Sequence, residues 1–236
     1  MCGRYVIYTA DELIDLHDIV EEAQRRADAI QGAAGSAADG AAGSEGEGRA
    51  SAQMPPSKPL LVKTGEIFPT NIAPVLIPRV DTDTKLTPHL LESHPMVWGF
   101  PQFGGKKGVV FNTRLETASE KHYWRDSLIR RRCVVPMSGF FEWQHGGPYD
   151  KQRYLFNLPD EPILYLAGVY KALPAADVVL ADRFSIMTTA PNASIREIHN
   201  RMPVVLRSDE IAQWLCEDPF AFIDRSGIAL RQQIAS

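Results

Sequence analysis

The second residue of the chain, Cys2, lies between Met1 and the run Gly3-Arg4-Tyr5. Removal of Met1, which a small second residue favours, would leave a thiol and an α-amine on one carbon skeleton. Unperturbed, the amine titrates at about 7.7–8.0 and the thiol at about 8.5, so both are partly deprotonated near neutral pH. Such an aminothiol suits aldehydes, because the amine forms a Schiff base and the thiolate then closes a thiazolidine ring on the imine carbon.

Two other roles for Cys2 stay open on its position alone. An N-terminal cysteine can attack an amide with its own amine as the base, as in peptidases of the N-terminal-nucleophile type. Alternatively, Cys2 is an ordinary member of a first strand, which the pattern from Cys2 to Tyr8 predicts. Retention of Met1 would block the amine and therefore the ring closure.

A second segment with polar chemistry runs from Phe111 to Thr117. Asn112 and Arg114 alternate with Thr113 at the end of a predicted strand, so they share one face. An amide can orient an amine, and a guanidinium can hold a phosphate with two hydrogen bonds. The alternative is a polar strand end with a surface pair between an arginine and a glutamate.

A carboxylate stands inside the apolar run Gly139-Phe140-Phe141-Glu142-Trp143. There Glu142 is expected to be either paired with a cation or partly desolvated, and desolvation would raise its pKa and suit proton transfer. Trp143 could stack on a nucleic-acid base. A buried Glu–Arg pair beside a core tryptophan is the competing interpretation.

The last chemical segment ends in Ile198-His199-Asn200-Arg201-Met202-Pro203. A helix predicted over 192–199 would end at His199, where an imidazole can act as acid or base near neutral pH. Arg201 lies just before a strand and could bind a phosphate. The competing role for His199 is a favourable interaction with the dipole of the helix.

Strands and helices must position these residues, and the sequence predicts most of them after residue 95. Gly/Pro turns separate many of the expected strands. These are Met96–Phe100, Val109–Thr113, Cys133–Pro136, Phe140–Gln144, Tyr154–Leu158, Ile163–Tyr170, Phe184–Thr189 and Pro203–Leu206. Further helices are expected at Ser119–Arg130 and Ser208–Cys216. This pattern is typical of a mixed α+β domain dominated by antiparallel strands.

An early helix is expected after Thr9 and Glu12, which match a capping box, and it fades near Ile30. The following residues, about 31–52, are mostly Gly, Ala and Ser, a composition too poor in apolar surface to offset its ordering entropy. We therefore expect a disordered insertion there, inside one domain that spans residues 1–236, because too little chain precedes it to fold alone.

The charge of the chain is nearly balanced, with a formal net charge of −4 over 236 residues. Residues 1–52 hold ten acidic and four basic residues, which leaves a net charge of +2 for the rest. This distribution removes an objection to nucleic-acid binding but does not supply the strongly basic surface that usually signals it.

The sequence also shapes expectations about location and cysteine chemistry. No apolar run is long enough to span a membrane and no secretory signal is visible, so we expect a cytoplasmic protein. We also expect it to be monomeric and associated with the nucleoid. The three cysteines, at irregular spacing, fit neither a disulfide framework nor a metal site. Cys133 and Cys216 are expected to be buried, reduced thiols.

Taken together, these segments resemble the SRAP family, the SOS-response-associated peptidases or abasic-site processing proteins. An N-terminal Cys-Gly-Arg-Tyr, a Phe-x-Glu-Trp and a His-x-Arg-Met-Pro, in this order, form a highly specific combination. The shared words are Met1-Cys2-Gly3-Arg4-Tyr5, Asn71 with Ala73-Pro74, Trp98-Gly99, Asn112-x-Arg114 with Glu116-Thr117, Arg132-Cys133 through Gly139-Phe140-x-Glu142-Trp143, Ala167-Gly168, Thr188-Thr189 with Asn192, and Ile198-His199-x-Arg201-Met202-Pro203.

The resemblance implies an α+β fold built around a distorted β-barrel. It also implies a thiazolidine crosslink between Cys2 and the ring-opened deoxyribose of an abasic site in single-stranded DNA, which protects the lesion in the DNA damage response. By position, Asn112 would hold the α-amine and Glu142 would move protons during ring opening and Schiff-base formation. His199 would assist ring opening and stabilise the intermediate.

The same resemblance implies a DNA-binding surface, and it implies no metal or organic cofactor. Arg114 and Arg201 would bind phosphates, and Arg4, Trp98 and Trp143 would line the path of the strand. Two other classes of function remain: a cysteine autopeptidase that removes its own Met1, and a non-catalytic module that binds single strands.

Overall fold

The structure, a computed structural model, describes residues 3–8, 14–40, 59–80, 86–102, 104, 106–146, 150–172 and 182–235. Met1 and Cys2 therefore lie outside the described residues, and so does the capping box expected at Thr9 and Glu12.

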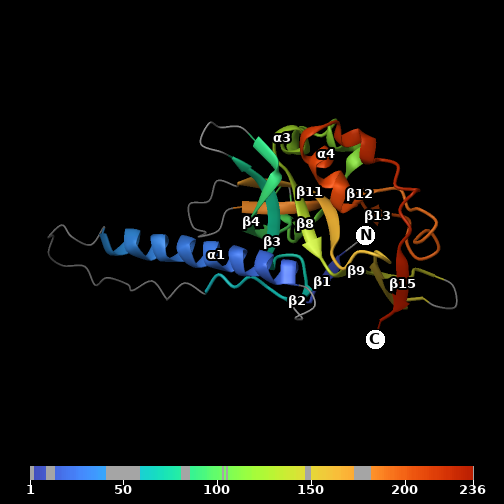
Figure 1. The fold of residues 1–236 in the computed structure, drawn as a ribbon, viewed down its shortest axis with the longest axis horizontal. Coiled ribbons are helices and arrows are strands. Elements are labelled where there is room, and N and C mark those ends of the chain that lie inside the picture. The colour runs from blue at the N-terminus through green and yellow to red at the C-terminus, as the bar shows by residue number, and fades with distance from the viewer. Residues whose placement is uncertain are drawn as a thin grey trace.

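Five strands close into a barrel, because each pairs with the next and the last pairs back with the first (Figure 1). All of these pairings are antiparallel except the one between β12 and β4. This arrangement confirms the predicted α+β fold with a barrel of mainly antiparallel strands. In order around the barrel the strands are β12 (Asp182–Thr189), β4 (Leu86–Trp98), β3 (Ile72–Val80), β8 (Arg132–Met137) and β11 (Leu164–Ala172).

Short strands extend the barrel where the site residues lie. β7 (Asn112–Arg114) runs parallel to β12 and pairs with Ile186–Thr188. β4 pairs with the same edge of β12 earlier in that strand, at Arg183 and Phe184. On the other edge of β12, β13 (Met202–Pro203) pairs with Thr188 and Thr189. Further short strands are β14 (Val205–Leu206), paired with β11, and the ribbon of β5 (Phe100–Pro101) and β6 (Val109–Val110).

A second, antiparallel sheet packs against the barrel. Its inner face carries Tyr5, whose ring centroid lies 5.0 Å from that of Trp98 in β4, and Phe140, which stacks on Phe156 at 5.2 Å. The contact of Tyr5 with Trp98 joins the sheet to the barrel, and all four rings belong to one apolar core. The strand order is β15 (Arg231–Ile234), β10 (Arg153–Asn157), β9 (Gly139–Trp143), β1 (Arg4–Ile7) and β2 (Gly65–Ile67).

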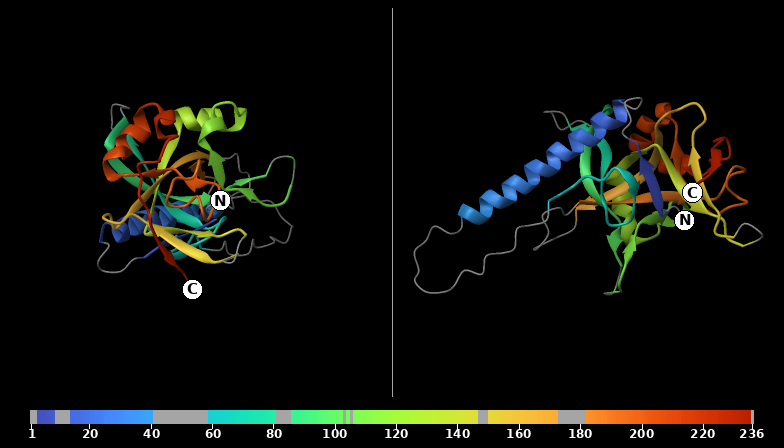
Figure 2. Two further views of the ribbon diagram at one scale, coloured as in Figure 1. Left: turned by 90° about the vertical axis from the view of Figure 1, so that its right-hand side faces the viewer. Right: turned by 90° about the horizontal axis from the view of Figure 1, so that it is seen from below.

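The longest helix, α1 (Ile14–Gly40), packs its first half against β3 and β4 and projects its second half away from the barrel (Figures 1 and 2). Leu16, Ala23 and Ala27 are fully buried on its inner face, at the spacing of an amphipathic helix. The short helices are α2 (Leu115–Ala118), α3 (His122–Arg130), α4 (Ile211–Cys216) and two 3-10 turns, Ser208–Glu210 and Pro219–Phe222.

Helix α1 is longer than the sequence suggested. It continues to Gly40, so residues 31–40, which we expected to be disordered, are helical. Alanine has the highest helix propensity, so the alanines in this stretch favour continuation of the helix. The remainder of the expected insertion, residues 41–52, lies outside the described residues.

The expected helix over 192–199 is also wrong, because these residues form successive turns. The side-chain oxygen of Asn192 accepts a hydrogen bond from the Ser194 backbone N–H at 2.9 Å, which competes with helical pairing. Its amide nitrogen donates to the backbone carbonyls of Arg225 and Ile228, at 3.1 and 2.6 Å. Asn192 therefore ties the segment to the C-terminal part of the chain instead of starting a helix.

Strand β3 and most of β4 were missed because proline usually argues against an interior strand. Here Pro74 of β3 faces Pro95 of β4 in the register, so the two missing N–H donors fall at one point of the ladder. Both strands carry further hydrogen-bonded residues on either side of this pair. Strand β15 was not anticipated either, since its four residues are all exposed and show no apolar alternation.

The close approach of β9 to β10 makes Gly139 a test of this packing. A Cβ at Gly139 would lie 2.7 Å from the Phe156 carbonyl oxygen and 2.9 Å from Leu155 Cδ1. Gly139→Ala should therefore lower the free energy of unfolding by about 1–3 kcal/mol, measured by urea denaturation.

The matched control is Gly32→Ala in α1, where a Cβ meets nothing within 4 Å. Alanine should raise the free energy of unfolding there by about 0.5–1 kcal/mol, because it restricts the unfolded chain. A stabilising effect of alanine at both positions would contradict the packing described for β9.

Candidate active site

The central residue of the site is Glu142, whose side chain is 2% exposed. In β9 it alternates with Phe141 and Trp143, so it points to the same face of the sheet as Phe140, into the apolar core. Burial raises the pKa of Glu142 to about 7, and the positive charge at the N-terminus of the chain opposes this rise. The predicted desolvation of this carboxyl group is confirmed.

The strands beside β9 leave Glu142 a narrow set of neighbours. On one side, Tyr154 of β10 stands directly across from it in the register. On the other, β1 pairs Tyr5 with Phe140 and Arg4 with Phe141, so Gly3 continues the register toward Glu142. Glycine places no side chain there, so the chain approaches the carboxyl group from its N-terminal end through backbone alone.

His199 lies in the turn that follows Ile198, and its ring is fixed by the main chain of Arg201. Its Nδ1 lies 3.0 Å from the Arg201 backbone nitrogen and 3.2 Å from the Arg201 carbonyl oxygen. A backbone N–H can only donate, so in the neutral ring Nδ1 accepts and the proton resides on Nε2. The neutral ring is therefore held as a hydrogen-bond donor at Nε2.

The neutral form of His199 is strongly favoured. The pKa of His199 is lowered to about 4, first by burial and then by the positive charges of the chain's N-terminus, His145 and Arg201, while a hydrogen bond to the Arg201 backbone opposes this shift. The same N-terminal charge thus acts on both Glu142 and His199. At neutral pH the site therefore combines a half-protonated carboxyl group with an uncharged imidazole.

A second histidine, His145, stands against His199 with ring centroids 5.4 Å apart in an edge-to-face arrangement. Because His145 lies just after the end of β9, its contact with His199 places the His199 ring near the strand end that carries Glu142. The preceding residue, Gln144, accepts a hydrogen bond from the Tyr154 hydroxyl at 3.2 Å. Sequence reasoning missed His145, and only its short separation from Glu142 could have signalled it.

Arg201 is held by a carboxylate and not exposed on the surface. Its Nη1 and Nη2 donate to the two carboxylate oxygens of Glu116 at 2.7 and 2.8 Å, and Nη2 also donates to the Thr188 carbonyl at 2.8 Å. The Arg201 side chain is 13% exposed. A phosphate contact by Arg201 stays a prediction, and it would have to use the donors that these bonds leave.

The polar strand end predicted around Asn112 has the expected alternation. Thr113 is buried and bonded to the Ser185 hydroxyl at 2.9 Å, while Asn112 is half-buried and Arg114 exposed on the opposite face. Parallel pairing places Arg114 beside Thr188, which also contacts Arg201. Asn112, Arg114 and the His199 loop therefore converge on the end of β12.

The outer face of the second sheet carries Arg4 and Trp143, which were predicted to contact DNA. The Arg4 guanidinium lies 4.3 Å from the Phe68 ring centroid and 5.0 Å from that of Trp143. Arg153, which the sequence analysis did not single out, lies 3.8 Å from the Phe141 ring centroid. This alternation of cations and aromatic rings is suited to stacking with bases, and DNA contact by Arg4 and Trp143 stays a prediction.

Trp98 does not line a path for DNA. Its side chain is fully buried, with ring centroids 5.0 Å from Tyr5 and 5.6 Å from Phe111. Its indole nitrogen donates to the Phe111 carbonyl at 3.0 Å. The resemblance had implied a place for Trp98 along the DNA strand, whereas its buried ring fills the contact between the barrel and the second sheet.

The remaining cysteines differ from each other. Cys133 is buried and burial raises the pKa of its thiol, whereas Cys216 is exposed, contrary to expectation. Within the described residues no group of three or more His, Cys, Asp or Glu could hold a metal ion. In the same part of the chain no helix is long and apolar enough to cross a membrane.

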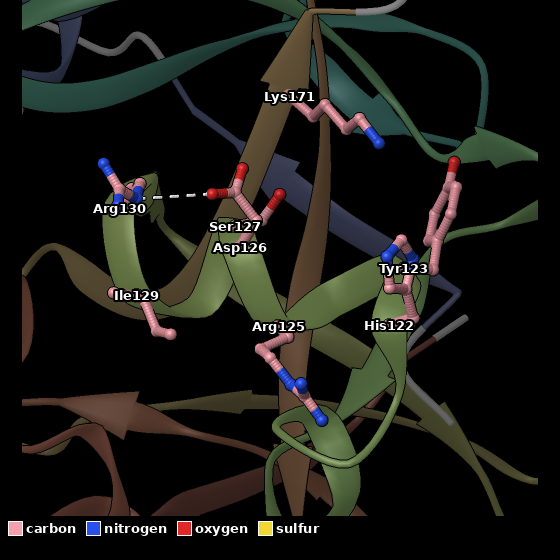
Figure 3. A pocket seen from close by; sticks show the side chains of 8 residues that line it. All are labelled: His122, Tyr123, Arg125, Asp126, Ser127, Ile129, Arg130 and Lys171. Atoms are coloured by element: carbon pink, nitrogen blue, oxygen red, sulfur yellow. Dashed lines mark ion pairs between the residues drawn. The ribbon is translucent and has the colours of Figure 1, made fainter.

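A hollow of about 590 Å³ lies on the side of α3, away from these residues (Figure 3). Lys171 extends toward Tyr123, with its ammonium 4.7 Å from the ring centroid, but Arg125 and Arg130 point elsewhere. Arg130 is paired with Asp126 at 3.4 Å. These side chains do not converge on one point, so the hollow does not assemble a reactive site.

The fold and the site together define an α+β barrel protein with a buried carboxyl group and a neutral histidine near its N-terminal strand. The chain belongs to the SOS response associated peptidase (SRAP) family, whose model matches residues 1–222. Membership agrees with the resemblance carried by the sequence words around Gly3, Glu142 and His199.

Individual relatives are more distant. Over 106 residues the chain is 33% identical to the abasic site processing protein YoqW of Bacillus subtilis, covering 45% of this chain and 47% of that protein. Over 128 residues it is 25% identical to the abasic site processing protein YedK of Escherichia coli, covering 54% of this chain and 57% of that protein. The chain thus spans about half the length of the curated relatives it matches.

Solved structures share the fold. A protein from Bacteroides thetaiotaomicron matches with a TM-score of 0.57 and 24% identity, over 73% of this chain and 78% of that one. A protein from Bordetella bronchiseptica matches with a TM-score of 0.62 and 14% identity over the full length of both chains. These likenesses concern the fold alone.

The buried carboxyl group makes a prediction about stability. The pKa of Glu142 is about 7 in the folded protein against 4.5 for an unperturbed carboxyl. Because the folded pKa is raised, the stabilising contribution is complete below pH 4.5 and is lost as the pH rises through 7. Glu142→Gln, which stays neutral, should therefore gain about 3 kcal/mol of unfolding free energy relative to wild type between pH 4 and pH 8.

Urea denaturation of both proteins at the two pH values measures this gain. Other titrating groups cancel because they are shared by the two proteins. An offset between variant and wild type that is the same at both pH values would show that Glu142 is not desolvated.

Proposed function

We propose that this protein processes abasic sites in single-stranded DNA by covalent capture through Cys2 after removal of Met1. The observation that carries the proposal is the buried Glu142, poised to gain or lose a proton near pH 7, next to the end of β1 from which the N-terminus emerges. The names of the relatives, abasic site processing proteins, agree with this substrate. Cys2 itself lies outside the described residues, so its chemistry is the central part of the proposal.

The reaction balances with the loss of one water. An abasic deoxyribose opens to an aldehyde, and the free α-amine of Cys2 adds to its carbon to give a carbinolamine. Protonation of the hydroxyl expels water and leaves an imine, to which the Cys2 thiolate adds. The nitrogen takes up a proton as the carbon–sulfur bond forms, and the product is a thiazolidine that holds the strand covalently.

Glu142 suits the proton transfers in this sequence. General acid–base catalysis is most effective when the pKa of the group lies near the working pH. With a pKa of about 7, the carboxyl group can accept a proton from the ammonium and return it to the departing hydroxyl. A surface glutamate with an ordinary pKa would be almost fully ionised and could only accept.

His199 and Asn112 supply hydrogen bonds in this proposal. The neutral His199 ring carries its proton on Nε2, because Nδ1 accepts from the Arg201 backbone, so it can donate to the sugar ring oxygen as the ring opens. The half-buried Asn112 amide is assigned to the α-amine, which it would orient toward the aldehyde carbon. Both roles require donors in fixed directions rather than strong acids or bases.

The strand would run over the outer face of the second sheet and the end of β12. Arg4 and Trp143 would contact bases or phosphates, and the exposed Arg114 would neutralise a phosphate. We assign no such contact to Trp98, which is buried. A formal net charge of −4 makes this binding weak for intact strands, so covalent capture rather than affinity would hold the lesion.

A second activity of the same groups is self-cleavage of Met1, as the family description as a peptidase suggests. Glu142 near the N-terminus could transfer a proton in that step. Mass spectrometry distinguishes the two uses: Glu142→Gln should retain Met1 if the chain processes itself, whereas loss of Met1 in that variant assigns the step to a separate enzyme.

The proposal predicts a heat-stable adduct between the processed protein and a single strand that contains one abasic site. Cys2→Ala should abolish the heat-stable adduct, because it removes the sulfur that closes the ring. Cys2→Ser is the matched control, since it keeps the amine and should leave only a Schiff base that borohydride traps. Denaturing gels and intact-mass spectra of the adducts provide the measurement.

Two outcomes would reject the proposal. The first is the absence of any adduct with the processed wild-type protein. The second is a heat-stable adduct of unchanged yield with Cys2→Ala, which would assign the capture to another nucleophile.

A further inference from the structure

We propose that Glu116 is a positioning residue of this site, because it holds the Arg201 guanidinium and thereby fixes the main chain that sets the tautomer of His199. Glu116 touches neither the substrate nor the reacting atoms in this account. The effect on crosslinking rests on the proposed function, whereas the effect on the imidazole does not.

The chain of contacts from Glu116 to His199 is short and specific. Glu116 accepts hydrogen bonds from Nη1 and Nη2 of Arg201 at 2.7 and 2.8 Å, which is a bidentate pair. The Arg201 backbone N–H in turn donates to His199 Nδ1 at 3.0 Å. Movement of the Arg201 side chain would therefore be passed directly to the group that decides which ring nitrogen carries the proton.

The Arg201 guanidinium has little freedom to leave this position. Both protons of Nη2 are engaged, one by Glu116 and one by the Thr188 carbonyl at 2.8 Å. The Nε atom is buried as well, so of the five donors of an arginine only one at Nη1 remains for another ligand. The Arg201 side chain is 13% and the Glu116 side chain 30% exposed, so water screens the pair only partly.

The position of Glu116 in the chain gives this pair its significance. Glu116 lies in the first turn of α2, four residues after Asn112 and directly beyond β7. Its partner Arg201 is 85 residues away, two residues after His199. The pair therefore ties the strand end that carries Asn112 to the turn that carries His199, and it sets the spacing of the two hydrogen-bonding groups.

Release of this tie should allow two arrangements of the imidazole. The carbonyl oxygen of Arg201 lies 3.2 Å from His199 Nδ1, almost as near as the N–H. A small rotation of the Arg201 main chain would favour Nδ1–H donating to that carbonyl, and Nε2 would then lose its proton. The ring could no longer donate to the sugar oxygen, although every reacting group would still be present.

The test compares Glu116→Gln with the wild-type protein in two measurements. In nitrogen-15 NMR spectra of the His199 ring, the wild type should show mainly the Nε2–H tautomer and the variant a mixture. At saturating abasic DNA, the variant should crosslink roughly tenfold or more slowly, as expected when an orienting partner is lost. Its half-saturating DNA concentration should change little, because a positioning residue does not bind the strand.

A matched control exists elsewhere in the chain. Glu210 accepts a bidentate pair from Arg225, with side chains that are 23% and 7% exposed. Arg225 holds the turn of Asn192 through its backbone carbonyl, which Glu210→Gln leaves in place. The hydrogen bonds of the Glu210–Arg225 pair do not involve His199 or Arg201. Glu210→Gln should therefore lose comparable stability but leave the His199 tautomer and the crosslinking rate unchanged.

A double-mutant cycle with Arg201→Met sharpens the test, because methionine retains the backbone N–H and removes the guanidinium. If the two residues act as one unit, Glu116→Gln, Arg201→Met and the double variant should lose similar factors of rate. If Glu116→Gln does not fold, Arg201→Lys provides the same comparison, since it retains the charge but not the bidentate geometry.

The inference is overturned if Glu116→Gln keeps both the tautomer and the saturated rate of the wild type. It is also overturned if the whole loss lies in the half-saturating DNA concentration, which would assign the pair to binding of the strand. Failure of the wild type to crosslink at all would reject the proposed function, and the NMR comparison would still decide the role of Glu116.

Discussion

The site depends on the burial of one carboxyl group, that of Glu142, in a sheet face that otherwise carries aromatic and aliphatic side chains. Burial disfavours the charged form of any group, so it raises the pKa of this acid to about 7 and lowers that of His199 to about 4. One physical cause thus gives a carboxyl group that exchanges protons at neutral pH and an imidazole that does not. At neutral pH the carboxyl group, and not the imidazole, is therefore the group that changes its protonation state. Environments that set pKa values in this way are common in acid–base sites.

The fold produces this burial by packing a second sheet onto a closed barrel. Tyr5 and Trp98 meet across the contact, and the same strand β1 that carries Tyr5 leads back through Gly3 to the side of Glu142. The end of β12 gathers the other groups, because β7 and β13 pair with its two edges. Among the described residues, Glu142 and Asn112 are therefore held by strand pairing in β9 and β7, whereas His199 is held in a turn by the main chain of Arg201.

Local chemistry was readable from the sequence, whereas long-range pairing was not. The apolar run around Glu142 predicted its desolvation, and alternation predicted that Asn112 and Arg114 share a face. By contrast, Arg201 was taken as a free cation because its partner Glu116 is 85 residues away. The burial of Trp98 depends on contacts with Tyr5 and Phe111, and the turns replace the helix expected after Asn192 because its ties to Arg225 and Ile228 are non-local.

The most direct measurement is the titration of the Glu142 carboxyl group by carbon-13 NMR in the intact protein. The account predicts a midpoint of about 7, raised from 4.5 by burial. A midpoint near 4.5 would mean that the carboxyl group is solvated, and it would contradict the acid–base centre on which the proposed chemistry rests.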